Sequence, residues 1–363
     1  MRFIGNKEKL LLKIHQAIVD EKIKGESFFD LFAGSTSVSK FFKKLDMKIS
    51  SCDLMFFSYI LQRAYIVNNK QCTFIKLTKK LKIKSNDLFS TPLLNVVDYL
   101  NNIKPVLGFI FQNYTPGGTS SMNQPRMYFS EDNGSRIDAI RTEIEIWNVE
   151  GLITEDEYYV LLACLIESVS FYSNISGVYG AFNKKWDPRA LKRFNLRPIT
   201  LIEGRKNNVS YNDNCINLLH EIKADIFYLD PPYNQRQYAP NYHILETIGK
   251  YDSPIISGVA GLRNYKNQKS NFCNKKTALE DLEKVCEKGL FKYLILSYNT
   301  EGIMSKNDIL TVLSNYGNVV LKEFDYPRFK SNNKNINSSR HIKEQLYILK
   351  NEKKSLDSDR RKA

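Results

Sequence analysis

The most specific chemistry in this 363-residue sequence comes from Asp230-Pro231-Pro232-Tyr233, at the end of a short apolar segment. Two consecutive prolines have fixed φ angles and no N–H group, so the chain leaves this segment in a rigid, extended form. Such rigidity can aim the Asp230 carboxylate and the Pro231 carbonyl at one point, where they would accept both protons of an amine on an aromatic ring. The amine nitrogen then becomes a better nucleophile, and the carboxylate stabilises the positive charge that develops on it. The ring of Tyr233 can stack on the same aromatic ring.

Two earlier acidic segments indicate a nucleoside cofactor. The stretch Asp30-Leu31-Phe32-Ala33-Gly34-Ser35-Thr36 takes an apolar run into a glycine turn. A strand that enters a helix through such a turn brings backbone amides close to a ligand. Asp53 stands at the end of the next apolar run, where doubly wound folds place an acidic residue that accepts hydrogen bonds from ribose hydroxyls. Each signal alone is weak, because an ordinary strand–helix turn and a surface aspartate have the same pattern.

A parallel sheet would bring these residues together. Apolar and periodic patterns predict helices over 8–23, 37–45 and 278–288, and strands over 27–32, 47–52, 225–230, 293–298, 319–324 and 345–349. Strands that alternate with helices form βαβ units, in which the carboxyl ends of the strands share one edge of the sheet. We therefore expect an α/β fold built on a doubly wound, Rossmann-like sheet.

A long block interrupts this alternation. It contains an aromatic stretch with Gly and Pro over 103–130 and predicted helices over 137–149 and 155–172. We predict a discontinuous catalytic domain, formed by 1–78 and 206–350, that carries 79–205 as a mainly helical insertion. The polar residues 351–363 are predicted to be disordered.

Composition narrows the class of protein. Apolar residues make up 42% of the chain, which is enough for a sizeable core, and no run of about twenty apolar residues predicts a membrane span. The first residues lack the pattern of a signal peptide, so a cytoplasmic location is expected. Six scattered cysteines and four scattered histidines predict buried thiols and no metal site. The formal net charge of +14 favours a polyanionic partner, although a lysine-rich proteome would give the same excess.

Taken together, these motifs resemble those of the amino-group DNA methyltransferases. Asp230-Pro231-Pro232-Tyr233 lies far downstream of the Asp30 segment, as in that group. The opening, Arg2-Phe3-Ile4-Gly5-Asn6-Lys7, is similar to the aromatic-x-Gly-x-Lys start of the Dam-like (alpha-group) adenine methylases. The resemblance covers 1–350. It implies a site-specific DNA adenine N6-methyltransferase that uses S-adenosylmethionine, with 79–205 as its target recognition domain.

The resemblance also implies a set of site residues. Asp30 to Gly34 would surround the methionine part of the cofactor, Asp53 would bind its ribose, and Asp213 its adenine. The target base would be held by the catalytic residues Asp230, Pro231 and Tyr233. Thr36 departs from the pattern, which usually has a small residue, often Gly, at this place in the turn. The full set predicted to contact the cofactor is Phe3, Lys7, Asp30, Phe32, Gly34, Asp53, Asp213 and Asp230.

Double-stranded DNA is the implied substrate. A base inside a duplex cannot reach a buried carboxylate, so the enzyme must flip the base out and offset the lost stacking with phosphate contacts. Arg126 and Arg136 flank an aromatic cluster and are further candidates for such contacts. The family also implies a separately encoded restriction endonuclease as a possible partner in a restriction-modification system. The main predicted DNA-binding residues are Lys184, Lys185, Arg189, Arg193, Arg328 and Lys330.

Three alternatives remain open from the sequence. An N4-cytosine DNA methyltransferase would use the same chemistry, but such enzymes more often have Ser in place of Asp230. An RNA adenine methyltransferase often carries an Asn-Pro-Pro-Tyr motif and usually lacks a large insertion. A catalytically silent DNA-binding relative would be free to lose Gly34, Asp53 or Asp230, yet all three are present.

Overall fold

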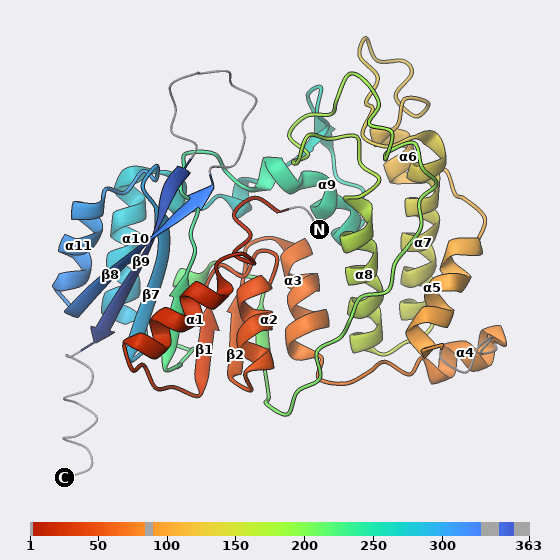
Figure 1. The fold of residues 1–363 in the computed structure, drawn as a ribbon. Helices are drawn as coiled ribbons and strands as arrows, with labels where there is room; N and C mark the ends of the chain where they lie inside the picture. The colour runs from red at the N-terminus through yellow and green to blue at the C-terminus, as the bar shows by residue number, and fades with distance from the viewer. Residues whose placement is uncertain (1–2, 84–89, 328–340, 352–363) are drawn as a thin grey trace.

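A mixed sheet with helices on both faces forms the centre of the computed structural model, which describes residues 3–83, 90–327 and 341–351. The described residues form a seven-stranded sheet in the order β3-β2-β1-β4-β7-β9-β8 (Figure 1). Its strands are β1 (Ser27–Asp30), β2 (Lys48–Cys52), β3 (Val209–Tyr211), β4 (Ile226–Leu229), β7 (Tyr293–Asn299), β8 (Gly317–Pro327) and β9 (His341–Asn351).

The strand order places a crevice between β1 and β4. Strands β3, β2, β1, β4 and β7 are parallel, whereas β9 runs antiparallel to both of its neighbours, β7 and β8. From β1 the sheet grows toward β2 and β3 on one side, and from β4 toward β7 on the other. A doubly wound sheet binds its ligands at the carboxyl ends of the strands, at the point where the strand order reverses. Here that point is the pair β1 and β4.

Helices cover both faces of the sheet and extend beyond the edge that β2 and β3 form (Figure 1). A small antiparallel hairpin, β5 (Ile256–Ser257) and β6 (Leu262–Arg263), lies apart from the main sheet. The helices are α1 (Leu11–Asp20), α2 (Ser37–Lys44), α3 (Phe56–Gln62), α4 (Ile75–Leu81), α5 (Pro92–Asn102), α6 (Phe109–Tyr114), α7 (Glu131–Val149), α8 (Glu155–Val169), α9 (Ala239–Lys250), α10 (Lys275–Lys288) and α11 (Lys306–Ser314).

Each central strand is buried on both faces. In β1, Phe28 belongs to the hydrophobic core on one face of the sheet and Phe29 to the core on the other. Tyr228 and Phe227 divide in the same way in β4, because successive side chains in a strand point in opposite directions. This arrangement explains why the strands appear in the sequence as continuous apolar runs and do not alternate.

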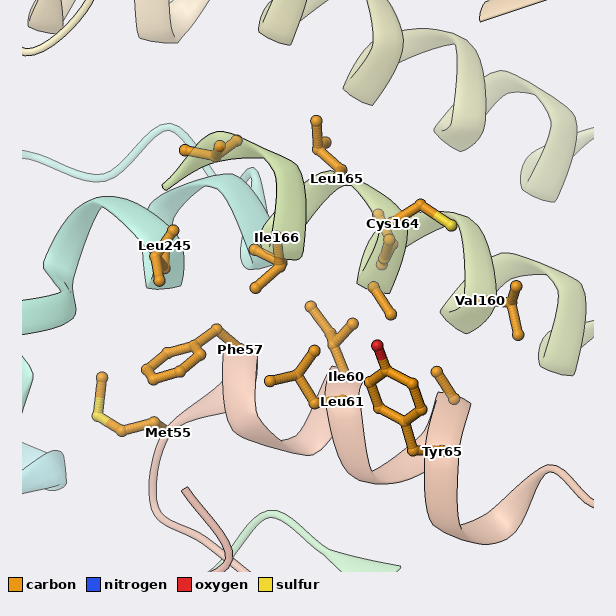
Figure 2. Packing of buried hydrophobic residues seen from close by; sticks show 14 of the residues in the cluster. Met55, Phe57, Ile60, Leu61, Tyr65, Val160, Cys164, Leu165, Ile166 and Leu245 are labelled. Atoms are coloured by element: carbon orange, nitrogen blue, oxygen red, sulfur yellow. The ribbon is translucent and has the colours of Figure 1, made fainter. Parts of the chain in front are cut away.

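The helices of the 79–205 block share a core with the central sheet. Side chains of α3, including Ile60 and Leu61, pack against Ile166 and Cys164 of α8, as Figure 2 shows, and α9 adds Leu245 to the same cluster. One continuous cluster thus joins α7 and α8 to the sheet. Within the described part of the block, residues 90–205 contain helices and no strand.

A buried arginine ties the same block to α9. Arg141 of α7 is 2% exposed, and its guanidinium donates hydrogen bonds to the carbonyls of Ile248 (3.0 Å) and Gly249 (3.3 Å) at the end of α9. The side chain also pairs with Glu145 at 2.7 Å. These contacts supply acceptors for a charge that would otherwise be costly to bury.

Most predicted elements are present with shifted ends. The predicted strand over 27–32 ends at Asp30, since the chain turns there into the glycine loop. The two final strands are longer than predicted, at 11 residues each, because they pair with one another along their whole length. Asn351 belongs to β9, so the predicted disordered tail was wrong at that residue, and 352–363 lie outside the described residues. All six cysteines are buried, as predicted. No helix in the described ranges has the length and apolar character needed to cross a membrane.

Candidate active site

A cleft lies where the sequence predicted a site, at the carboxyl ends of β1, β2 and β4. Pro231 and Tyr233 are next to the cleft and do not line it, whereas Asp230 and Pro232 do. All eight residues predicted to contact the cofactor line it: Phe3, Lys7, Asp30, Phe32, Gly34, Asp53, Asp213 and Asp230.

The glycine turn after β1 is held by Asp53. The backbone N–H of Gly34 donates to Asp53 Oδ2 (2.8 Å), and the N–H of Met55 donates to Asp53 Oδ1 (2.8 Å). Burial raises the pKa of the Asp53 carboxyl to about 6, although these hydrogen bonds lower it. A carboxylate oxygen has two lone pairs, so both oxygens of Asp53 can still accept a hydroxyl. Asp53 thus connects the loops after β1 and β2 and faces the cleft.

Gly34 allows the N-terminal segment to close over the turn. Its φ is +48°, and a Cβ placed on it would come within 2.8 Å of the Phe3 ring. Phe3 in turn stacks on Tyr242, with ring centroids 4.8 Å apart. Only glycine combines this backbone conformation with so close an approach. Phe3 and Gly34, which are 31 positions apart in the sequence, therefore form one wall of the cleft.

Thr36 adopts the conformation that explains why this family often has Gly at its position. Its φ is 62° and its ψ is 14°, in the left-handed region. The residue is fully buried, and its hydroxyl donates to the carbonyl of Ser35 at 2.6 Å. A β-branched residue in this region costs about 1–2 kcal/mol relative to ordinary backbone. The loop therefore keeps the left-handed turn without the second glycine.

Asp30, the last residue of β1, carries a carboxylate oxygen without a protein partner. Ser39 donates to its Oδ2 (2.6 Å), while Oδ1 is buried and has no hydrogen bond among the described residues. Burial, together with the nearby charges of Asp230 and Asp53, raises the pKa of Asp30 to about 7, although the hydrogen bond from Ser39 lowers it. A buried acceptor that lacks a donor is costly, and it is satisfied when a ligand supplies one. The unpaired oxygen thus fits a cationic or hydrogen-bond-donating group of a ligand in the cleft.

Asp230 is held by the N-terminal segment and by its own motif. Lys7 Nζ lies 2.9 Å from Asp230 Oδ1, and the Tyr233 hydroxyl donates to the same oxygen at 2.7 Å. Lys7 Nζ also contacts the Tyr233 hydroxyl and lies 3.2 Å from Oε1 of Glu344. The Tyr233 ring packs edge-on against Tyr298, with centroids 5.0 Å apart. In this structure, the Tyr233 hydroxyl donates to the carboxylate, and the ring packs on Tyr298 and does not line the cleft.

Burial and charge act in opposite directions in this cluster. Burial raises the pKa of Asp230 and the charge of Glu344 raises it further, while the ammonium of Lys7 lowers it. Burial alone would lower the pKa of Lys7, but the carboxylates of Asp230 and Glu344 outweigh it and raise that pKa. Asp230 is therefore a desolvated carboxylate with a fixed cation beside one oxygen, which suits it to accept protons from a neutral amine.

Phe272, Asp281 and Glu344 in and beside the cleft carry no sequence signal that could have identified them. Phe272 packs edge-on against Phe32, with centroids 5.2 Å apart, and Asp281 of α10 lines the same wall. Asp213, by contrast, is one of the predicted residues, and its Oδ1 accepts from the Asn217 amide at 2.9 Å. Glu344 lies 114 positions after Asp230 and outside any motif. Only the folded chain brings it to the Asp230 cluster.

Four of the predicted DNA-binding residues fall within the described part of the chain; all four are exposed, and two of them already have protein partners. Lys184 and Lys185 are exposed. Arg189 pairs with Asp187, and Arg193 donates to the carbonyl of Asn101 at 3.2 Å. Arg328 and Lys330 lie outside the described residues.

The candidate Arg126 is wrong as a DNA contact. It is 6% exposed, and its guanidinium donates to the carbonyls of Asn113, Gly258 and Val259 at 3.0 Å each. These bonds tie the β5–β6 hairpin to the end of α6. Arg126 therefore has a structural role.

The comparisons with known proteins agree with this geometry. The family described as D12 class N6 adenine-specific DNA methyltransferase matches residues 3–312, which include the glycine turn and Asp230. The chain belongs to this family. Three curated relatives align over more than nine-tenths of the chain. They are the type II methyltransferase M.FokI of Planomicrobium okeanokoites, 41% identical over 349 residues, the modification methylase StsI of Streptococcus sanguinis, 37% over 357, and the type II methyltransferase M.NlaIII of Neisseria lactamica, 36% over 334.

The relatives differ in length. The alignment with the FokI methyltransferase covers 94% of this chain and 51% of the relative. The alignment with the StsI methylase covers 96% of this chain and 52% of the relative. It thus spans about half the length of these two relatives. The match to the NlaIII methyltransferase covers 91% of the chain and 93% of the relative. Among the described residues, no group of three or more His, Cys, Asp or Glu side chains is arranged to hold a metal.

Proposed function

We propose that this D12-class protein transfers a methyl group to N6 of a flipped-out adenine in double-stranded DNA, at a specific short sequence. The observation that carries the proposal is that one cleft contains both the glycine turn with Asp53 and the Asp230 carboxylate. The glycine turn with Asp53 suits a nucleoside cofactor, and the Asp230 carboxylate suits an aromatic amine. Their common cleft would bring donor and acceptor into contact, and the family match supports adenine over cytosine.

The residues present fit S-adenosylmethionine as the methyl donor. Asp30 has a buried oxygen without a partner, which an α-ammonium group would satisfy, and the close approach at Gly34 leaves a cradle without a side chain. Asp53 would accept the ribose hydroxyls and Asp213 the adenine amine. When bound, this cofactor supplies an activated methyl group on a sulfonium. A methyl donor of this kind requires no metal.

Asp230 would act on the incoming base. Its Oδ1 is engaged by Lys7 and Tyr233, which leaves Oδ2 to accept an N–H of the N6 amine, while the Pro231 carbonyl accepts the other. The N6 lone pair would attack the methyl group that the bound cofactor supplies, with the neutral thioether as the leaving group. Positive charge develops on N6, and the carboxylate stabilises it. One N6 proton then leaves to the Asp230 carboxylate, and the N–H electron pair stays on nitrogen.

The DNA would lie across the carboxyl ends of the strands. We propose that 1–78 and 206–350 form the catalytic domain and that 79–205 form the target recognition domain. Lys184 and Lys185 would contact phosphates, with Arg189 and Arg193 available after exchange of their present partners. The curated relatives are named type II methyltransferases or modification methylases. By analogy, this protein would protect DNA against a separately encoded restriction endonuclease.

A base-resolved methylation map tests this function. The chain and its Asp230→Ala variant are expressed in a bacterial host that lacks DNA methylation, and the genomic DNA of each is sequenced for modified bases. We expect N6-methyladenine confined to one short motif, and absent with the variant. N4-methylcytosine in the motif would refute the choice of base. An unmodified genome, from folded protein that binds S-adenosylmethionine, would favour an RNA substrate or a silent DNA-binding protein.

A further inference from the structure

A second carboxylate, that of Glu344, contacts the same two partners as Asp230. Glu344 of β9 is 4% exposed, and its Oε1 lies 3.2 Å from Lys7 Nζ and 2.8 Å from the Tyr233 hydroxyl. Ser297 of β7 donates to the same oxygen at 3.0 Å. Glu344 does not line the cleft, so it cannot touch a ligand there directly. Its contacts show that it shares both partners of the Asp230 carboxylate.

Asp230 and Glu344 compete for these shared partners. Tyr233 has one hydroxyl proton, yet its oxygen lies 2.7 Å from Asp230 Oδ1 and 2.8 Å from Glu344 Oε1. A hydroxyl can donate to only one acceptor at a time. The single positive charge of Lys7 is likewise divided between the two carboxylates. Each donor that Glu344 draws toward itself is withdrawn from Asp230.

This withdrawal bears on the chemistry of the proposed reaction. A carboxylate that is fully neutralised by a lysine and a tyrosine is a weak acceptor for a neutral amine. With Glu344 present, the ionised forms of Lys7, Asp230 and Glu344 carry a net charge of −1, which favours positive charge on a nearby nitrogen. The charge of Glu344 also acts on the phenols of Tyr233 and of Tyr228 in β4. Both stay neutral, because burial holds the pKa of each well above the usual range.

We propose that Glu344 is a positioning residue for methyl transfer, which shares Lys7 and Tyr233 with Asp230 and thereby keeps Asp230 a strong acceptor for the target amine. The proposal rests on the proposed methyltransferase function and adds a residue to it. Glu344 acts through Asp230. Its loss should therefore lower the rate of transfer and leave the binding of cofactor and DNA almost unchanged.

The test compares Glu344→Gln with Glu344→Asp in the full chain. Glu344→Gln keeps the shape and removes the charge, and Glu344→Asp keeps the charge and shortens the side chain. Steady-state methylation of a duplex with one site is measured from pH 5.5 to 9, with the dissociation constant of S-adenosylmethionine and the melting temperature of each variant. Glu323→Gln is the matched control, because Glu323 lies on the neighbouring strand β8 and pairs with Lys306 away from the cleft.

We expect Glu344→Gln to lower kcat about 10- to 100-fold, with KM values within about twofold of wild type. The acid limb of kcat/KM should move to lower pH, because a negative charge near Asp230 is gone. Glu344→Asp should leave that limb in place and be more active than Glu344→Gln. Wild-type kcat and acid limb in Glu344→Gln would overturn the proposal, as would Glu344→Asp activity no higher than that of Glu344→Gln. A wild-type enzyme without methylation would instead reject the proposed function.

Discussion

Replacement of Asp30 by Asn should move stability and cofactor binding in opposite directions. Asp30 is 1% exposed, and its pKa is raised from 3.8 to about 7, mainly by burial. A carboxyl with a raised pKa holds its proton more tightly in the folded state than in the unfolded chain. Its contribution to stability is therefore fully present below about pH 4 and is lost as the pH rises to about 7. Above that pH the folded protein carries an unfavourable buried charge.

The size of the effect follows from the same values. The interval from 3.8 to about 7 corresponds to about 4 kcal/mol in the free energy of unfolding, at about 1.4 kcal/mol per pH unit. Of this, about 3 kcal/mol falls between pH 5 and pH 8. Asn cannot ionise, and it can still accept the hydrogen bond from Ser39. From pH 5 to pH 8, the free energy of unfolding of Asp30→Asn should therefore rise by up to about 3 kcal/mol relative to that of the wild type.

Urea unfolding of both proteins at pH 5 and pH 8 measures this gain, and calorimetry at pH 8 measures the affinity for S-adenosylmethionine. We expect the variant to be the more stable at pH 8 and to bind the cofactor at least about tenfold more weakly, since Asn offers no charge to the α-ammonium group. A variant that unfolds at lower urea than wild type at pH 8 would refute the argument. An equal change at both pH values would show that ionisation of Asp30 is not its cause.

Three further substitutions probe the cleft and its support. Gly34→Ala should weaken binding of S-adenosylmethionine in calorimetry, because its Cβ would displace Phe3, and unchanged affinity would mean that Phe3 moves aside freely. Asp53→Asn should raise the dissociation constant of S-adenosylmethionine about 10- to 100-fold, because an amide leaves one of two backbone N–H donors without an acceptor. Arg141→Met should lower the free energy of unfolding by about 3 kcal/mol in urea, since two buried carbonyls lose their donor. A loss below about 1 kcal/mol would contradict this role.

Sequence predicts which residues meet at the carboxyl ends of β1, β2 and β4 for a physical reason. Asp30 is the last residue of a buried strand, and Gly34 and Asp53 follow buried strands. Parallel strands end at one edge of the sheet, so the order of these residues along the chain fixes their neighbourhood in space. Asp230 is found in the same way, because its two prolines leave a local pattern. The cleft confirms that these residues lie together.

Other features depend on contacts that no local pattern records. Glu344 reaches Lys7 only because β9 pairs with β7 in one register, in which Ser297 and Leu346 are opposite. The roles of basic side chains are hardest to assign, since the sequence does not show whether an arginine faces a phosphate or donates to backbone carbonyls inside the protein. Arg126 shows this, because its burial appears only once the β5–β6 hairpin is placed against it.

The shared core between the sheet and α8 has a consequence for how sequence specificity could change. A recognition unit joined by a linker can be exchanged between enzymes as a module, because few contacts cross its boundary. Here Ile60 and Leu61 of α3 pack directly on Ile166 of α8 (Figure 2). Arg141 of α7 also donates to carbonyls at the end of α9. A chimera that replaces 79–205 alone would have to rebuild this interface. New specificity should therefore arise more readily by drift in the surface loops, or in chimeras that carry α3 and α9 along with the block.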